Sequence, residues 1–486
     1  MPPSLVIGLI VTYFAVLLIT SWITSGSGDD GTFFTANRQS PWYLVAFGMI
    51  GASLSGVTFV SIPGAVGTAT GHFYYFQMVL GYIVGYLVIG TVLLPLYYRL
   101  NLVSIYGYLE QRLGHYAYKT GAAFFLLSRV IGAAFRLFLV ATVLQVALFD
   151  ALEVPFAVTV TVTIALIWLY TFRGGIKTIV WTDTLQTASM LAAVVVTLIV
   201  VSQDMGWSPT QLINEVRASE YSTIFNWDAG HPRYFWKQFL AGAFIAIVMT
   251  GLDQDMMQKN LTCRSLGDAQ KNMFWFTIVL VFVNLLFLGL GALLYIYSSQ
   301  KGIALPTATD EVYPLLALNH FPRIAGILFL VGIIAAAYSS ADSALTSLTT
   351  SFCVDFLGYT RNEAELSNPN MRRRVHLGFS LALLLVILAF KAINNDAVIN
   401  AVFDAAGYTY GPLLGLFAFG IFTKRGLHNT AFVMVVCIAS PLLTYGITLL
   451  VPMIWEGSQV GFEKLIYNGL LTFIGIWLLS HKKMPA

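Results

Sequence analysis

Charged side chains are scarce in this sequence. Asp, Glu, Lys and Arg make up 10% of the 486 residues, and hydrophobic residues make up 57%. Soluble domains usually carry about 25% charged residues, so this composition excludes an ordinary soluble protein. Cysteine is scarce as well: Cys263, Cys353 and Cys437 are scattered and show no spacing typical of a metal site or a disulfide framework. What remains is a polytopic membrane protein.

Apolar segments long enough to cross a bilayer, each of about 17–25 residues, recur along the chain. The first, Leu5–Ile23, has no basic region before it and no A-x-A cleavage site, so we expect a retained span. The predicted cores are 4–23, 43–65, 76–98, 120–149, 156–171, 179–202, 235–256, 273–297, 323–352, 376–393, 398–422, 430–451 and 463–480. The predicted fold class is therefore an all-α membrane protein with about 13 transmembrane helices.

Lysine and arginine are distributed unevenly between the two sides of the membrane. If Lys482 and Lys483 lie in the cytoplasm, 17 basic residues fall in inside loops and 7 in outside segments or outer helix ends. This excess is typical of the cytoplasmic side. We therefore expect a multi-pass protein of the cell membrane, with its N-terminus outside and its C-terminus in the cytoplasm.

The order of the segments favours an internal repeat. The helices of 43–202 and those of 235–422 form two five-helix sets of opposite orientation, and inverted repeats of this kind build transporters with a site where helices break. The predicted organisation has five parts: a first helix and loop (1–42), the first set (43–202), an external connection (203–234), the second set (235–422) and two further helices with a tail (423–486).

Hydroxyl groups are concentrated in Ala335–Ser351, which reads AAAYSSADSALTSLTTS. At helical spacing, Ser339, Ser343, Thr346 and Thr350 share one face. One interpretation is packing between helices through small polar residues. The other is a set of hard oxygen ligands for a small cation. Asp342 favours the second, because an ionisable residue within a membrane is a functional candidate.

A second unusual stretch is GMIGASLSGVTFVSIPG, from Gly48 to Gly64. Its glycines, serines and Pro63 predict a broken helix, and unwound backbone at membrane depth is tolerated where it lines a cavity or is buried in protein. A packing face of small residues is the alternative. The corresponding segment of the second set has only Gly242 and Thr250-Gly251, so its break is predicted less strongly.

Ionisable residues in the apolar segments are the remaining candidates. Asp183 lies about two turns from Arg173, either as part of a site or as an interfacial acid paired with Arg173 or Lys177. Arg136 lies mid-helix, and it either forms a buried salt bridge or offers a planar fork to a carboxylate. For the acids of the DQD sequence at 253–255, a solvated helix end is a sufficient explanation.

Four motifs together resemble the sodium:solute symporter family. They are YTFRGGIKTIVWTDTLQ (170–186), AAAYSSADS (335–343), GASLSGVTFVSIPG (51–64) and DQDMMQKNLTCRSLGDAQK (253–271), which between them span most of the chain. The resemblance implies a LeuT-like core of two inverted five-helix repeats. It also implies transport of a small solute by alternating access, driven by sodium.

The resemblance also implies cation sites. One sodium is expected on the carbonyl oxygens of Gly51, Leu54 and Ala336 and the hydroxyls of Ser339 and Ser340. The sialic-acid symporters of the family bind a second sodium, and the matching positions here are Asp183, Ser339, Asp342 and Ser343. Position 342 is a serine in those relatives and an aspartate here, so the resemblance implies one sodium ion and leaves a second open.

Substrate positions of the same symporters map onto Ser53, Ser55, Thr58, Phe73, Gln77, Arg136 and Phe244. An arginine with hydroxyls and an amide suits a hydroxylated carboxylate such as a sialic or other sugar acid. Relatives move proline, sugars, vitamins or iodide, so a neutral sugar, an amino acid, a vitamin or an inorganic anion stays an alternative.

Two other function classes are less consistent with the sequence. A membrane-embedded enzyme needs paired catalytic groups or a metal cluster, yet the seven histidines fall mostly in predicted loops or helix ends and no H-E-x-x-H occurs. A channel would show a filter loop, and none is evident. We expect no enzymatic activity and no nucleic-acid partner. The expected partners are a small solute, sodium and the lipid bilayer, with a monomer sufficient and the oligomeric state open.

Overall fold

The computed structural model describes residues 3–24, 34–68, 70–359, 369–393, 397–428, 430–454 and 459–481. Its regular structure is helical apart from β1 (Gly426–Leu427) and β2 (Ser480–His481), which pair antiparallel among the described residues. A helix satisfies its own backbone hydrogen bonds, which a lipid environment requires. The predicted all-α class is confirmed.

The first predicted five-helix set folds as long helices linked by short turns. Its elements are α3 (Trp42–Ser53), η2 (Val57–Ser61), α4 (Ile62–Ala65), η3 (His72–Tyr74), α5 (Tyr75–Val88), η4 (Ile89–Leu93), α6 (Leu94–Arg99), α7 (Gly107–Leu113), α8 (His115–Leu144), η5 (Gln145–Phe149), η6 (Asp150–Leu152) and α9 (Phe156–Asp204). Helices α10 (Pro209–Ala218) and η7 (Glu220–Ser222) follow and connect the two sets.

The second set repeats this pattern, with a broken helix at its start. It comprises α11 (Phe235–Ala246), η8 (Ile247–Gly251), α12 (Gln254–Asn260), α13 (Leu266–Lys301), η9 (Thr309–Glu311), α14 (Val312–Leu315), η10 (Leu316–His320), α15 (Arg323–Ser351), η11 (Phe352–Phe356), α16 (Pro369–Ile393), α17 (Val398–Thr409) and α18 (Gly411–Phe422). The outer boundaries of the two sets stay a prediction.

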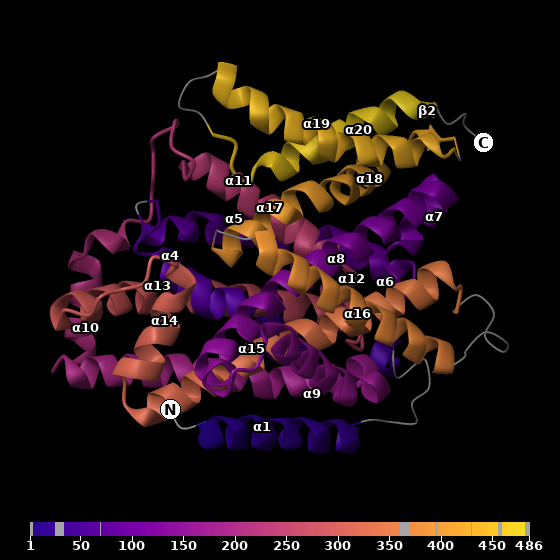
Figure 1. The fold of residues 1–486 in the computed structure, drawn as a ribbon. Helices are drawn as coiled ribbons and strands as arrows, with labels where there is room; N and C mark the ends of the chain where they lie inside the picture. Colours follow the sequence, from indigo (N-terminus) through magenta and orange to yellow (C-terminus); the bar gives the residue numbers. More distant parts are fainter. Residues whose placement is uncertain are drawn as a thin grey trace.

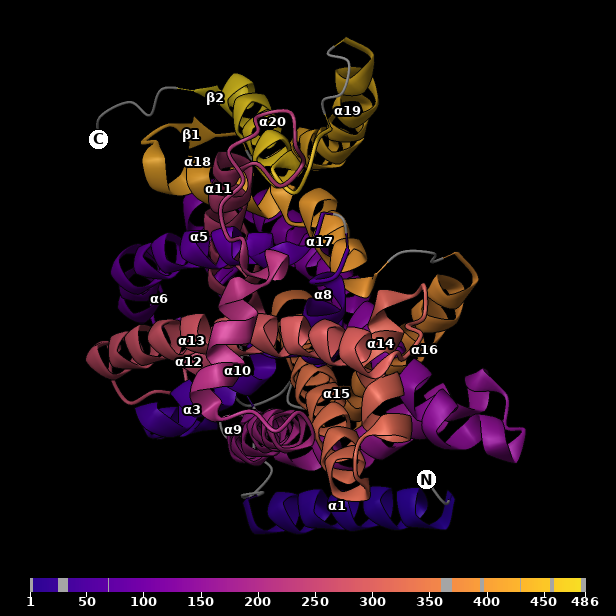
Figure 2. The ribbon, with the colours of Figure 1, turned by 90° about the vertical axis from the view of Figure 1, so that its left-hand side faces the viewer.

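Helices outside the two sets flank the core on opposite sides. They are α1 (Pro3–Thr24), the short η1 (Ala36–Arg38), α19 (Phe432–Ile454) and α20 (Lys464–Leu479). In Figures 1 and 2, α1 lies along the lower edge beside α9, and α19 and α20 lie along the upper edge above α18. The centre of the molecule is therefore formed by the two sets.

The predicted break after Gly48 is confirmed. Helix α3 ends at Ser53, and the following helical pair η2–α4 is bent by 61° from it. Leu54 has a non-helical backbone (φ −81°, ψ 66°), so the i to i−4 hydrogen-bond pattern is interrupted here. A Cβ atom on Gly56 would lie 2.6 Å from a methyl group of Val140, so glycine allows the broken segment to approach α8.

The second set breaks more sharply than the sequence predicts, with a 68° bend between η8 and α12. The break lies at Leu252–Asp253, and the Asp253 side chain caps the start of α12 by accepting from the backbone N–H groups of Asp255 and Met256. Gly242 serves another purpose: its Cβ would lie 2.1 Å from the Met78 carbonyl oxygen, so it allows α11 to pack closely on α5.

A third bend, of 46°, separates α17 from α18 at Tyr410. Pro412 has no backbone N–H, so the carbonyl group four residues earlier, on Tyr408, loses its helical donor. Asn468 of α20 replaces that donor with a hydrogen bond of 2.8 Å to the Tyr408 oxygen. Side chains from a flanking helix therefore stabilise the bend.

Helix α9 cannot be straight. Its 49 residues would extend about 73 Å. Yet Phe156 packs on Phe138, which lines one cavity together with Pro314, while Thr197 hydrogen-bonds Tyr313. Phe156 and Thr197 thus lie near the same cavity, so α9 is bent between them.

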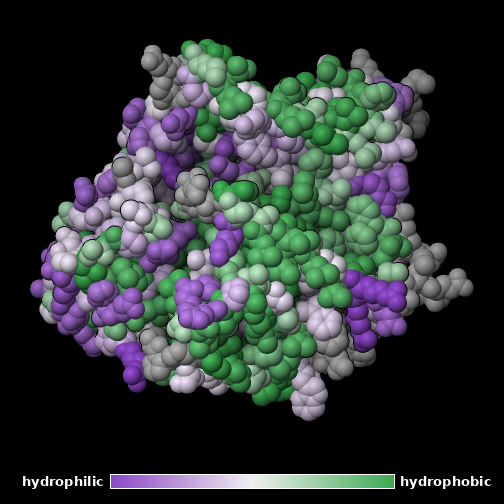
Figure 3. Space-filling model, viewed as in Figure 1, coloured by the Kyte–Doolittle hydropathy of each residue, from purple (hydrophilic) through white to green (hydrophobic). Residues whose placement is uncertain are grey.

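The surface is suited to lipid. Figure 3 shows hydrophobic side chains across the middle of one face, with hydrophilic side chains gathered mainly toward its left and right edges. Large apolar side chains such as Trp22, Phe282 and Leu442 are exposed. Within the described residues, eight helices can span a membrane by length and apolarity, or up to 11 if each bent pair is one span. A total of about 13 crossings therefore stays a prediction.

Candidate functional site

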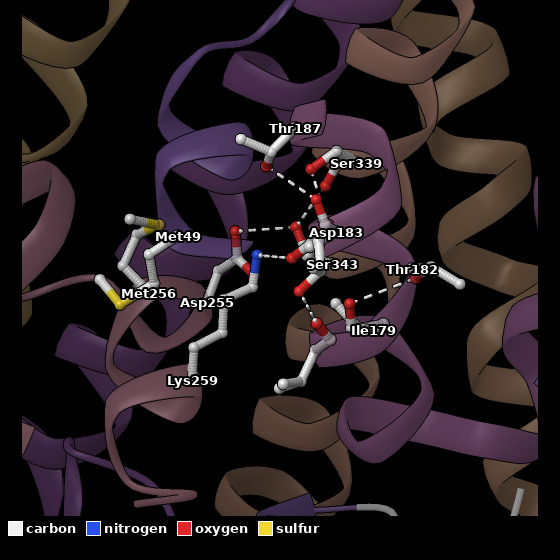
Figure 4. A network of polar contacts seen from close by, with 12 residues as sticks. Met49, Ile179, Thr182, Asp183, Thr187, Asp255, Met256, Lys259, Ser339 and Ser343 are labelled. Carbon is white, nitrogen blue, oxygen red and sulfur yellow. Dashed lines mark hydrogen bonds and ion pairs between the residues drawn. The ribbon is translucent and has the colours of Figure 1, made fainter. Parts of the chain in front are cut away.

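A buried ion pair joins α9 to α12 at the centre of the molecule. Asp183 and Lys259 are both shielded from solvent, and the Lys259 Nζ lies 2.7 Å from the Asp183 Oδ2 (Figure 4). The other carboxylate oxygen, Oδ1, accepts a hydrogen bond of 2.6 Å from Ser339 of α15. Pairing of Asp183 at the membrane interface is therefore the wrong interpretation: its ionic partner lies on the other five-helix set.

A second buried ion pair lies close by. Arg129 of α8 pairs with Asp255, and its guanidinium also lies 4.0 Å from Asp253. Asp253 accepts a further hydrogen bond from the Tyr410 hydroxyl. The prediction of a solvated helix end for Asp253 and Asp255 is wrong, because the bend before α12 directs this acidic turn into the protein, where both carboxylates are fully buried.

The hydroxyl face of α15 points at these ion pairs. Ser339 reaches Asp183, and Ser343 donates to the Asp255 Oδ2 at 3.3 Å (Figure 4). About two turns nearer the end of α15, Thr350 accepts a hydrogen bond from Gln258 of α12. The hydroxyl stripe therefore does more than fill space between helices: it solvates carboxylates inside the protein.

The residues expected to hold the first cation fit a cation site. Gly51 packs against Thr187 and the backbone of Asp183 on α9, and Ser339 of α15 donates to the Asp183 side chain, so α9 holds together the two helices that carry the expected ligands. The break at Leu54 frees carbonyl groups that a continuous helix would use. The Ser340 hydroxyl is buried and has no hydrogen-bond partner among the described residues. Buried polar groups are normally hydrogen-bonded, so an unpaired hydroxyl at this position is consistent with a cation ligand.

The residues expected to hold the second cation are also close together, but a positive charge is already present among them. The ammonium group of Lys259 lies on Asp183, and the charges of Asp342 and Asp255 act on it as well. Ser343 approaches the same cluster through Asp255. This part of the expected ligand set therefore does not fit a sodium ion while Lys259 stays in place.

A central cavity of about 100 Å³ adjoins the first of these sites. Four of the residues predicted to contact the solute line it: Ser53, Ser55, Thr58 and Arg136. Ser53 lies just before Leu54 on the broken helix, and Ser55 and Thr58 lie just after it. The same interruption therefore directs hydroxyls to the cavity and carbonyl groups to the expected cation site.

The other three predicted contacts lie outside this cavity's lining. Gln77 is fully buried, and its amide bonds the backbone of Tyr74, Arg233 and Asn226, which fastens the connection between α9 and α11 to α5. Phe73 is buried in η3, just before α5, where its N–H donates to the Thr223 carbonyl. Phe244 packs on the hydrophobic core. Their role toward a solute stays a prediction.

Sequence reasoning missed a row of aromatic residues on the cavity wall. Tyr75, Tyr82 and Tyr86 line it from α5, together with Phe403 of α17. The three tyrosines recur at intervals of seven and four residues, which places them on one helix face, so helical periodicity could have revealed them.

Arg136 and Arg129 lie on one helix, seven residues apart, yet their surroundings differ. Arg129 is neutralised by Asp255 and Asp253. Arg136 lines the cavity and forms no ion pair within the part of the chain that the structure describes. The buried salt bridge considered for Arg136 is therefore formed by Arg129 instead. The Arg136 guanidinium is available to a ligand.

Comparison with known proteins agrees with this arrangement. Residues 33–437 match the sodium:solute symporter family. The chain belongs to that family. Its relatives include the sodium/sialic acid symporter NanT of Aliivibrio fischeri, which is 26% identical over 435 residues (86% of this chain and 82% of NanT). The human sodium/iodide cotransporter is 24% identical over 432 residues, with 84% of this chain and 65% of the cotransporter covered.

Solved structures of similar fold support the architecture. A Na⁺-coupled sialic acid symporter, solved with substrate in an outward-open state, matches 98% of this chain and 99% of its own with a TM-score of 0.78 and 21% identity. Mhp1, a nucleobase-cation-symport-1 transporter, matches with a TM-score of 0.58 and 14% identity, covering 93% of this chain and 95% of Mhp1. The predicted LeuT-like fold is confirmed, and sodium is the coupling ion of this symporter family.

Proposed function

We propose that this sodium symporter imports a small hydroxylated carboxylate, of the sugar-acid class, by alternating access. The observation that supports this choice is the Arg136 guanidinium, which lines the central cavity without a protein carboxylate to neutralise it. A buried charge is costly unless it is paired, so such a cavity favours an anion that arrives with the solute. A planar guanidinium matches a carboxylate with two parallel hydrogen bonds.

The rest of the cavity complements the remainder of such a solute. Ser53, Ser55 and Thr58 offer hydroxyls from the broken helix, and Thr250 and Asn284 add a hydroxyl and an amide from the second set. These groups can both donate and accept hydrogen bonds, as sugar hydroxyls do. The relatives named for sialic acid support the same class, whereas the relative named for iodide keeps a small inorganic anion as the alternative.

The cavity must widen during transport. Its volume of about 100 Å³ is below the roughly 300 Å³ at which ligand pockets usually begin. Tyr75 and Phe403 stack with ring centroids 6.3 Å apart, and with Ile399 they line both this cavity and a smaller one of about 30 Å³ beside Arg233. We infer that Tyr75 and Phe403 part to admit the solute from the outer side.

The opposite end of the cavity is closed by hydrogen bonds to the second broken helix. Tyr97 and Tyr106 donate to the carbonyl groups of Gly251 and Leu252, at 2.8 and 3.0 Å. Gln254 bonds the backbone of Ile105 and Val103. We propose that these contacts hold the cytoplasmic side shut, with the N-terminus outside and the C-terminus inside, and that they break when the solute is released.

Coupling follows from the position of the expected sodium ligands. The Leu54 carbonyl, assigned to the cation, lies between Ser53 and Ser55, which line the solute cavity. A sodium ion held there by Leu54 and Ser340 would fix the conformation of the break, and with it the two hydroxyls. A ligand that orders part of a site lowers the conformational cost for the next, so sodium should raise solute affinity.

Replacing Ser340 with alanine should raise the sodium concentration needed for half-maximal solute uptake by about tenfold. The loss of one polar contact to a charged group is worth about 1.4 kcal/mol, which is a factor of ten. Ser347→Ala is the matched control, because Ser347 is buried on the same helix and its hydroxyl returns to the Ala344 carbonyl. An equal sodium requirement in both variants would place the ion elsewhere.

The solute class is tested with purified protein in proteoliposomes. Uptake of radiolabelled sialic acid, lactate, glucose and proline is measured under an inward sodium gradient and under an equal potassium gradient. We expect sodium-dependent uptake of sialic acid or lactate and competition between these two monoanions. Sodium-driven uptake of glucose or of the zwitterion proline, without uptake of either monoanion, would contradict the proposal.

A further inference from the structure

The positions expected to bind a second sodium ion contain a positive charge of the protein's own. We propose that the Lys259 ammonium takes the place of that ion, so that the chain binds a single sodium. This inference rests on the proposed sodium-coupled function. It assigns to Lys259 a role in setting the number of coupling ions.

The contacts of Lys259 are those of a cation at this position. Its Nζ lies 2.7 Å from one oxygen of Asp183, and the other oxygen of Asp183 accepts from Ser339, so both carboxylate oxygens are in use. Asp342 and Asp255 lie close enough for their charges to act on the ammonium group. Lys259 thus lies among residues from α9, α12 and α15, and Figure 4 shows it reaching across toward them.

The fold keeps Lys259 in this position. The 68° bend before α12 turns the helix inward, and the Asp253 cap fixes its first turn. Lys259 lies on this short helix and is 1% exposed, so it cannot reach water from where it lies. A tethered ammonium is always present at the site, whereas a sodium ion binds there only at sufficient concentration.

A sodium ion and Lys259 exclude one another at Asp183. Like charges a few ångströms apart in a buried site repel strongly, because little solvent screens them. The first expected site avoids this conflict, since it uses the carbonyl group of Leu54 and the free hydroxyl of Ser340 on the side of the break. One cation site is therefore open to sodium, and the other is occupied by a side chain.

The number of bound ions decides whether transport moves charge. A single sodium ion carried with a monoanion transfers no net charge, so the membrane potential neither drives nor opposes uptake. Each extra positive charge would couple uptake to the potential. Removing the lysine charge is therefore expected to turn an electroneutral cycle into one that responds to voltage, provided that the second ion is carried through.

Direct binding of ²²Na⁺ to purified protein tests the inference without relying on transport. We expect about one ion per chain in the wild type and about two in Lys259→Met, because the Asp183 carboxylate then loses the ammonium group that neutralises it. Lys259→Met combined with Asp183→Asn should return to about one, since the central carboxylate charge is removed as well.

Lys464→Met is the matched control, because Lys464 also pairs with an aspartate, Asp404, at 2.8 Å, on a helix outside the two sets. It should keep the wild-type stoichiometry. Two ions in the wild type, or no gain in a folded Lys259→Met, would overturn the inference. If Lys259→Met does not fold, the inference is tested by the number of sodium ions bound to the wild type and to the double variant Lys259→Met/Asp183→Asn. An absence of saturable ²²Na⁺ binding in the wild type would instead refute the proposed sodium coupling.

Discussion

Replacing Arg136 with lysine is expected to weaken solute binding by about 10- to 100-fold. Lysine keeps the charge but loses the planar fork that bonds a carboxylate through two N–H groups. The loss of one hydrogen bond to a charged group costs about 1.5–3 kcal/mol, and each 1.4 kcal/mol is a factor of ten. Isothermal titration calorimetry with sodium and solute together measures the change.

The same experiment separates a binding role from a structural one. Sodium binding without solute should be unchanged in Arg136→Lys, because no described carboxylate depends on Arg136. Arg217→Lys is the control, since Arg217 is exposed on helix α10, between the two five-helix sets. Wild-type solute affinity in a folded Arg136→Lys protein would remove the main reason to favour an anionic solute.

Replacing Arg129 with methionine is expected to destabilise the folded protein by about 3–5 kcal/mol, the usual cost of leaving a buried charge without its partner. Asp253 and Asp255 are fully buried, and Arg129 is the cation that contacts both of them. Thermal unfolding in detergent, followed by tryptophan fluorescence, should show a large fall in the midpoint temperature.

Two further variants show that the effect comes from charge. Arg129→Met combined with Asp253→Asn and Asp255→Asn should recover much of the lost stability, since no uncompensated carboxylate remains. Arg112→Met is the matched control, because Arg112 bonds the carbonyl groups of Gly420, Thr423 and Arg425 and forms no ion pair with a carboxylate in the part of the chain that the structure describes. An equal loss in Arg112→Met would mean that packing, not charge, explains the result.

Much of the architecture could be predicted from the sequence because the membrane restricts the choices. Apolar length and the need to satisfy backbone hydrogen bonds identify helices, and the interruptions at Gly51–Pro63 identify the first break. The second break was predicted only weakly, because its signal is not glycine but the side chain of Asp253 acting as a helix cap. An aspartate can be identified as a helix cap only when the start of the following helix is known, and the structure shows that α12 starts after Asp253.

The candidate site was predicted in part for a similar reason. The hydroxyls of α15 and the acid Asp183 stand out in apolar surroundings, and Arg136 stands out on its helix. The aromatic wall was missed because tyrosines are common at membrane interfaces, although Tyr75, Tyr82 and Tyr86 share one helix face. Whether these tyrosines face a cavity or lipid depends on which helices pack against α5. The spacing of residues within one helix carries no information about that packing.

The sequence by itself determined that this chain is a helical membrane protein of the sodium:solute symporter family, since local composition and motifs suffice for that. Only the tertiary structure decided how the charges combine. Asp183 and Lys259 are 76 residues apart, and Arg129 and Asp255 are 126 apart, yet each pair is in contact. Pairing across such distances is produced by the bend before α12 and the packing of α8, α9 and α15. Of the two arginines that line the cavity, it neutralises Arg129 and leaves Arg136 without an ion pair among the described residues.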